Sequence, residues 1–261
     1  MAGRGDGAQL VALLQSFDRR QGRLGLRLGD GPLSLHLAQT AAPSSIVGVD
    51  LDERAIARAR TALTTSRREN WSCIPEFLLS EPTRVPVDDT SVDTILAFDC
   101  VEHIMDPETI MAEWRRVLRP TGRVLIEWCP FKGPWGPHMH NLIPIPWAHV
   151  LFGEQALFEC AERIYEDPQY VRRHWVFDEN GTRRPNSWRT LRRFSQAGYI
   201  NQLDVSGFQH IAREAGFSVE RFDAKGIGAE GMKRALGQAL LAVPWAKEYA
   251  TSFVVCELVA A

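Results

Sequence analysis

The 261-residue sequence predicts an α/β fold with a mostly parallel, doubly wound sheet. In the first half of the chain, short apolar segments typical of buried strands alternate with segments of helical periodicity. Such alternation requires right-handed crossovers between parallel strands. The length is sufficient for one substantial domain, or for a domain with an inserted cap.

The first predicted element is a short helix at residues 9–17. After it, the predicted strands are residues 23–28 (RLGLRL), 44–50 (SSIVGVD), 92–99 (VDTILAFD) and 121–129 (TGRVLIEWC). The helices between them are predicted at residues 34–40, 52–63 and 106–120. Asp106 has the residue type of an N-cap, and Pro107 suits the first helical position. The inner faces of the last two helices are predicted to carry Ile56, Ala59 and Leu63, and Ile110, Met111, Trp114 and Leu118.

The second half of the chain begins with a long interruption at residues 130–204, which are rich in Trp, Pro and Arg. Connections of this length are usually functional lids or inserted caps. We therefore expect a single domain over residues 1–261, with residues 130–204 as an inserted helical lid that binds the substrate. Residues 212–224 predict a helix, a turn at Gly216 and a strand, and residues 251–260 predict the last strand.

Charge and cysteine content argue against several classes of protein. The formal net charge is −2, which offers no general attraction to nucleic acid. The five cysteines contain no CxxC pair, which argues against a disulfide framework and against a zinc site. The N-terminal apolar run is too short for a signal peptide, and no apolar run of about 20 residues predicts a membrane span. We expect a cytoplasmic protein without nucleic-acid or membrane partners.

A nucleotide-type loop follows the first predicted strand. Gly29-Asp30-Gly31 precedes a helix, and Asp50 ends the next strand 19 positions after Gly31. In dinucleotide and nucleoside sites, such glycines admit the ligand close to the backbone, and an acid about 20 residues later binds ribose hydroxyls. Asp52 is the better N-cap for the following helix, which leaves Asp50 for a ligand.

Over residues 27–125 the chain resembles the small-molecule branch of the class I S-adenosylmethionine-dependent methyltransferases. The motifs that carry the resemblance are LGDGPL, VGVDLDERAIARAR, RVPVDDTSVDTILAFDCVEHIMDP and EWRRVLRPTGRVLI, with RVLRPTG and VEH the most specific. The later GYINQLDVSGFQHIAREAGFSV also looks like that branch. The resemblance implies a Rossmann-like seven-stranded sheet whose last strand is antiparallel, and S-adenosyl-L-methionine as cofactor.

The resemblance assigns cofactor contacts around the first two strands. Gly29, Asp30 and Gly31 would face the methionine part, and Asp50 would hold the ribose. Leu51 would pack on one face of the adenine, and we expect it in the core whether or not it touches a ligand.

Further contacts follow the later strands. Glu81 occupies the place of the acid that accepts from the adenine amino group, although a solvated loop acid is an equal alternative. Phe98 and Asp99 would lie beside the amino end of the cofactor and the transferred methyl.

Three residues depart from the family pattern. Arg27 replaces an acid that helps to fix the cofactor ammonium group, and Leu33 replaces a third glycine. Pro82 has no backbone N–H to offer to the adenine ring. Each departure would weaken binding by about 1 kcal/mol, so together they would lower affinity about a hundredfold.

Histidines supply candidate bases for the reaction. His138 follows the predicted strand at 121–129, where the substrate should approach, and relatives with a similar segment carry a histidine there. The pair Glu102 and His103 is the rival, with a packing role as its equal alternative. His138 and His140 would form a metal site only with an acid or cysteine at ligand spacing, and the sequence offers none there, so no metal is expected.

The insertion also supplies candidates for the acceptor pocket. Trp135 and Trp147 flank the histidines, and His140 lies between them, so these three are expected to bind the substrate. The clustered arginines of the insertion are either a solvated face or a site for a substrate carboxylate or phosphate.

These observations predict methyl transfer to an oxygen or nitrogen of a small molecule, such as a specialised metabolite. The alternative is a methyltransferase-like protein with a degenerate cofactor site, which acts as a partner subunit or catalyses another reaction.

Overall fold

The structure, a computed structural model, describes residues 23–27, 31–40, 43–66, 71–170, 176–178, 180–228 and 231–261. The predicted helix at residues 9–17 lies outside these ranges. Gly29, Asp30 and the side chain of Arg27 lie outside them too. The departure of Arg27 from the family pattern therefore stays a sequence-based prediction.

The described strands form one sheet in the order β3-β2-β1-β4-β5-β7-β6. Their bounds are β1 (Arg23–Arg27), β2 (Ser45–Asp50), β3 (Glu76–Leu79), β4 (Val92–Phe98), β5 (Leu118–Trp128), β6 (Phe217–Lys225) and β7 (Phe253–Ala260). The strands β3, β2, β1, β4 and β5 pair in parallel, and β7 is antiparallel to both β5 and β6. The prediction of a mostly parallel, Rossmann-like sheet is confirmed.

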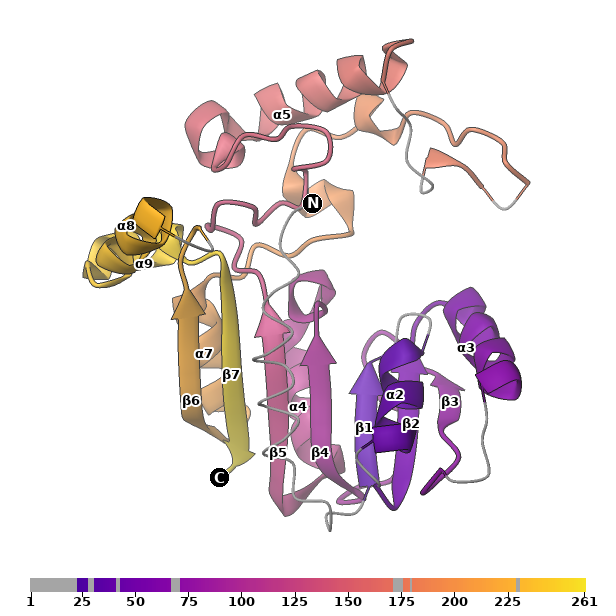
Figure 1. The fold of residues 1–261 in the computed structure, drawn as a ribbon. Helices are drawn as coiled ribbons and strands as arrows, with labels where there is room; N and C mark the ends of the chain where they lie inside the picture. Colours follow the sequence, from indigo (N-terminus) through magenta and orange to yellow (C-terminus); the bar gives the residue numbers. More distant parts are fainter. Residues whose placement is uncertain are drawn as a thin grey trace.

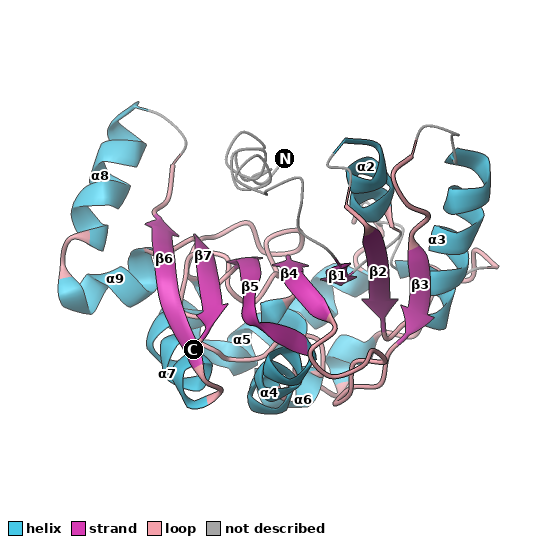
Figure 2. Cartoon of the chain, turned by 90° about the horizontal axis from the view of Figure 1, so that it is seen from below, coloured by secondary structure: helices cyan, strands magenta, loops and turns pink. Residues whose placement is uncertain are grey.

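Helices cover both faces of the sheet. They are α2 (Pro32–Thr40), α3 (Glu53–Ser66), α4 (Pro107–Val117), α5 (Ala148–Glu166), α6 (Phe194–Ala197), α7 (Val205–Glu214), α8 (Gly231–Leu241) and α9 (Pro244–Ala250), with 3₁₀ turns η1 (Val101–His103) and η3 (Ser187–Arg189). Figure 2 shows α4 and α7 on one face and α2 on the other. Within the described ranges, no helix is both long enough and apolar enough to cross a bilayer.

The larger core lies between the sheet and helices α4 and α7. Trp128 on β5 is fully buried and packs against Phe208 of α7, with ring centroids 5.0 Å apart. Asp106 caps α4 as predicted, because its carboxylate accepts the backbone N–H of Thr109 at 3.0 Å. The buried side chains of α4, α7 and the sheet form one apolar core.

The prediction that Leu118 extends the inner stripe of α4 is wrong. The helix ends at Val117, and Leu118 has an extended backbone and begins β5, opposite Val92. Pro120 explains the early end, since proline disfavours helical geometry in the residue before it and donates no backbone hydrogen bond. Leu118 is nevertheless buried, as a core residue of the strand.

Within the segment 130–204, the described residues include α5, η3 and α6, which lie outside the sheet. Figure 1 shows α5 beyond the carboxyl ends of β4 and β5. This segment has its own apolar cluster, in which Phe158 and Phe194 are fully buried with ring centroids 4.9 Å apart. The inserted segment therefore has an apolar core that is separate from the core of the sheet.

Candidate active site

The candidate site lies at the carboxyl ends of the parallel strands. The strand order reverses between β1 and β4, and ligands of open α/β sheets bind at such a switch point. Gly31, just before α2, has φ +81°, a conformation that favours glycine, and its carbonyl accepts the N–H of Leu35. Leu33, in the place of the third glycine, packs with Leu37 against the sheet. This substitution therefore serves the packing of α2.

Asp50 ends β2 at this edge, as predicted. Its side chain is largely buried, and one carboxylate oxygen accepts the N–H of Asp52 at 2.9 Å. Asp52 caps α3 as expected, by accepting the N–H of Arg54. Asp50 is therefore not left entirely to a ligand, because its hydrogen bond with the N–H of Asp52 orients the carboxylate toward the start of α3.

Leu51 is not a core residue, contrary to the prediction. Its side chain is 56% exposed, because β2 ends at Asp50 and Leu51 lies in the turn before α3. An exposed leucine beside a strand-end carboxylate is an apolar surface available to a ligand.

Glu81 follows β3 in a tight, exposed turn. It pairs through its backbone with Arg84 in an isolated antiparallel bridge, and Ser80 Oγ donates to the carbonyl of Arg84. Pro82 lies inside this turn, where its fixed φ suits the bend. The turn keeps Glu81 near the end of β3.

The end of β4 carries Phe98 and Asp99. Phe98 is partly buried against the α2 side of the sheet. Asp99 has φ +53°, and its N–H donates to the carbonyl of Glu127 on β5 at 2.9 Å. Left-handed backbone in a residue other than glycine is costly and is often found at functional sites. In the described ranges only four such residues occur; Asp99, His138 and Trp147 are three of them, all named from sequence.

Beside Asp99 lies Glu127, which the sequence reasoning did not single out. Burial and the neighbouring Asp99 carboxylate raise the pKa of Glu127. Its place near the end of β5, between two buried strand positions, was the only signal that pointed to it.

Glu102, His103 and His138 come together above β4. Glu102 is buried in η1, and its Oε1 lies 3.7 Å from His138 Nε2. The His103 ring meets the His138 ring edge-on, with centroids 5.1 Å apart. His103 Nδ1 forms a hydrogen bond with the carbonyl of Tyr199 at 2.5 Å. The two rival histidines of the sequence analysis thus belong to one cluster.

His138 is neutral at physiological pH. Burial lowers its pKa to about 4, with further lowering by His103 and His140 that outweighs the opposite effect of Asp99. Its φ is +56°, and its N–H donates to the carbonyl of Trp135 at 2.9 Å. The loop therefore fixes an uncharged imidazole beside the Glu102 carboxylate.

Cys129, which follows β5 directly, completes this cluster. Its sulfur, a Glu102 oxygen and a His138 nitrogen all lie within 4.8 Å of one another. Glu102 and Cys129 therefore lie at possible ligand distance from His138 in space, although neither has a typical ligand spacing from it along the chain. Burial raises the pKa of the Cys129 thiol, as do Glu102, Asp99 and Glu127.

The three residues that were predicted to bind the acceptor do not all line the same pocket. Trp135 and His140 lie edge to face at 6.0 Å and line a small apolar pocket inside the inserted segment, with Ile143, Ala148 and Leu157. Trp147 is outside that lining, and its indole N–H donates to the carbonyl of Tyr249 in α9. This hydrogen bond joins the insertion to α9, and the role of Trp147 in acceptor binding stays a prediction.

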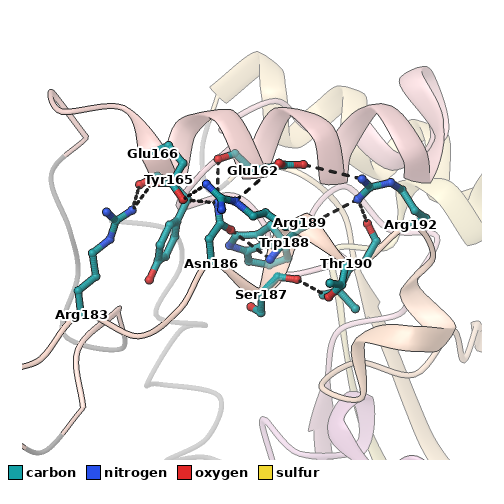
Figure 3. A network of polar contacts seen from close by, with 11 residues as sticks. Glu162, Tyr165, Glu166, Arg183, Asn186, Ser187, Trp188, Arg189, Thr190 and Arg192 are labelled. Atoms are coloured by element: carbon teal, nitrogen blue, oxygen red, sulfur yellow. Dashed lines mark hydrogen bonds and ion pairs between the residues drawn. The ribbon is translucent and has the colours of Figure 1, made fainter.

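The arginines of the insertion pair with acids of α5. Figure 3 shows Arg183, Arg189 and Arg192 directed at Glu162 and Glu166. The nitrogen–oxygen distances are 3.1 and 3.2 Å to Glu166 from the first two arginines, and 3.9 Å to Glu162 from Arg192. Because these three arginines pair with carboxylates of the protein, a structural role is favoured for them over recognition of a substrate anion.

Comparison with known proteins links part of the chain to one family. A family model described as a methyltransferase domain matches residues 24–126. This segment is similar to that methyltransferase family. An uncharacterised methyltransferase of Mycolicibacterium vanbaalenii is 33% identical over 149 residues, which cover 57% of this chain and 50% of the relative. The chain spans about half, or less, of the length of the curated relatives that it matches.

Solved structures of low sequence identity share the fold. An S-adenosylmethionine-dependent methyltransferase of Methanosarcina mazei has a TM-score of 0.56 and 15% identity, covering 95% of this chain and 96% of the other. The [4+2]-cyclase SpnF has a TM-score of 0.55 and 13% identity, covering 99% and 84%. The solved structures share the fold of the chain, the family model matches residues 24–126, and S-adenosylmethionine is the cofactor that these similarities imply.

Proposed function

We propose that this protein transfers a methyl group from S-adenosylmethionine to an oxygen or nitrogen of a small molecule, with a specialised metabolite as the acceptor. The observation that carries the proposal is that two sets of side chains lie at the same edge of the sheet. The strand-end acids Asp50 and Asp99 suit the cofactor, and the Glu102–His103–His138 cluster suits activation of an acceptor.

The residues at the strand ends fit the cofactor. Asp50 would bind the ribose hydroxyls, since a carboxylate accepts about four hydrogen bonds and the one from Asp52 fixes its direction. The exposed Leu51 would cover one face of the adenine, and Glu81 would accept from its amino group. Gly31, with its left-handed backbone at the start of α2, admits a ligand close to the main chain.

The acceptor would bind between the strand ends and the inserted segment. When bound, the cofactor supplies an electrophilic methyl group on a sulfonium. The protein must then hold the nucleophile about 3 Å from that methyl, exclude water and take up the acceptor proton. His138, which is 24% exposed beside the buried Glu102, is our proposed residue for preparing the acceptor atom. His103, which contacts both His138 and Tyr199, would position it.

A second candidate function is a protein of this fold with a weak cofactor site. Arg27, Leu33 and Pro82 favour it, because each differs from the family pattern in the cofactor region. A solved neighbour named as a [4+2]-cyclase also has this fold, so the fold alone does not choose the reaction.

Calorimetric titration with S-adenosylmethionine and its demethylated product tests the proposal. We expect both to bind, and Asp50→Asn to lower affinity by about 10- to 150-fold, as for hydrogen bonds to a charged group. Asp52→Asn is the matched control, because asparagine also caps helices, and its affinity should match the wild type. Absence of heat with both compounds would favour the second candidate.

A further inference from the structure

We propose that Glu102, Cys129 and His138 form a binding site for one zinc-type divalent cation, which activates a hydroxyl group of the acceptor. The inference rests on the proposed function, since the ion would lie on the acceptor side of the methyltransferase site. It narrows the acceptor from an oxygen or nitrogen compound to an alcohol or phenol.

The three donors come from different parts of the chain. Glu102 lies in η1 after β4, Cys129 follows β5, and His138 lies in the loop before α5. β4 and β5 are paired in parallel, so their carboxyl ends bring the first two donors together. The loop fixes the third, because the His138 N–H donates to the Trp135 carbonyl.

The distances are close to those of a coordination site. Two nitrogen or oxygen ligands at about 2.0–2.1 Å from a tetrahedral zinc ion lie about 3.3 Å apart. His138 Nε2 and Glu102 Oε1 are 3.7 Å apart, and all three donor atoms lie within 4.8 Å of one another. Closure around an ion therefore requires the donor atoms to approach one another by about 1 Å.

The chemistry of the donors selects the class of ion. Magnesium and calcium prefer oxygen ligands, whereas a thiolate with an imidazole and a carboxylate suits zinc and its neighbours in the first transition row. Three protein ligands with an open fourth position are typical of catalytic zinc sites. The mixed set therefore points to a catalytic ion with a position for the acceptor oxygen.

The charges around the sulfur favour a cation. The Glu102 carboxylate lies beside the Cys129 sulfur, and the acids Asp99 and Glu127 are backbone hydrogen-bond partners at the ends of the two adjacent strands. Glu102 is 1% exposed, and in such a poorly hydrated place electrostatic attraction is stronger than in water. A bound divalent ion would offset this negative charge and favour the thiolate as its ligand.

Methyl transfer with the ion bound is balanced in atoms and in charge. Coordination of the acceptor hydroxyl lowers the pKa of its O–H group, and the proton leaves to solvent. The acceptor oxygen then forms a bond to the methyl carbon while the carbon–sulfur bond of the sulfonium breaks. The products are a methyl ether, the thioether form of the cofactor and one proton.

Cobalt(II) titration of the chelator-treated full chain tests the site. We expect one cobalt per chain with thiolate-to-metal absorption, and displacement of cobalt by zinc. Cys129→Ser should abolish that absorption, and His138→Gln and Glu102→Gln should weaken cobalt binding at least about tenfold. Cys160→Ser and His210→Gln are the matched controls, because both residues are exposed and outside the cluster. Their titrations should equal that of the wild type.

This design distinguishes a failure of the proposed metal site from a failure of the proposed methyl transfer. Each variant is also titrated with the demethylated cofactor, which reports an intact fold and cofactor site without using the metal. Absence of cobalt binding, or binding that survives in all three site variants, would overturn the metal site. In that case His138 stays as a metal-free proton acceptor. Cobalt binding without cofactor binding would keep the metal site and reject methyl transfer.

Discussion

At the residue scale, the candidate residues owe their surroundings to parts of the chain that are distant in sequence. Asp50, Asp99 and His138 all lie at the edge where the parallel strands end. Their environments depend on neighbours distant in the chain, such as Glu127 beside Asp99 and Glu102 beside His138. Burial and nearby charged groups shift the pKa of Glu127 upward and the pKa of His138 downward.

Replacement of His138 by alanine tests its role at this scale. We expect turnover to fall by about 10²-fold or more, since loss of acid–base or equivalent activation has effects of that size. Cofactor affinity should stay within a few-fold, because His138 lies on the acceptor side. The measurement is single-turnover methylation with an acceptor found by screening alcohols, phenols and amines. His210→Ala, an exposed histidine of α7, is the control. Unchanged turnover in His138→Ala would remove it from the reaction.

At the element scale, α7 shows how the insertion is attached to the sheet. Asp204 caps α7 by accepting the N–H of Gly207 at 2.8 Å, and it pairs with Lys132 at 2.5 Å. Lys132 lies near the start of the insertion and Asp204 is its last residue. The Asp204 carboxylate therefore links the two ends of the insertion and also caps α7.

We expect Asp204→Ala to lower the free energy of unfolding by about 1–2 kcal/mol, mostly through the lost cap. Lys132→Ala removes only the half-exposed ion pair and should cost less than about 1 kcal/mol. Urea unfolding of the two variants measures both values. Equal losses in the two variants would show that the cap contributes nothing.

The effect of Asp204 should depend on pH. Burial acts to raise its pKa, but Lys132, Gly207 and Ser206 together lower it. A lowered folded-state pKa gives stability that is present above the unfolded value, about 3.9, and is lost as the pH falls through the folded value. The stability difference between wild type and Asp204→Ala should therefore be constant near neutral pH and shrink below about pH 4.

At the scale of the whole molecule, two layers meet at the candidate site. The strand ends and the turns after them supply Asp50, Asp99, Glu102 and Cys129, and the insertion supplies His138. Each layer has its own apolar core. We propose that the insertion acts as a lid over the strand ends, as in many enzymes.

Hydrogen exchange tests the lid at this scale. We expect exchange in residues 130–204 to slow when the demethylated cofactor and an acceptor are both present, since a closed lid protects its amides. The cofactor alone should protect mainly the segments around Gly31 and Asp50. Protection confined to those segments under both conditions would place the acceptor site elsewhere.

The sequence by itself determined the alternation of strands and helices and the caps at Asp52 and Asp106. These features depend on neighbours a few residues away, so periodicity and turn chemistry report them. It missed the short strand β3 (Glu76–Leu79), whose four residues carry too little pattern, and it extended α4 through Leu118.

Only the tertiary structure decided which distant side chains meet. Leu51 is exposed because the chain turns there, and Trp147 bonds to α9 instead of lining the pocket. Glu102, Cys129 and His138 have no common spacing in the chain, yet they meet because β4 and β5 are parallel neighbours and the following loop folds back over them. Strand pairing creates such contacts, and a single sequence does not record it.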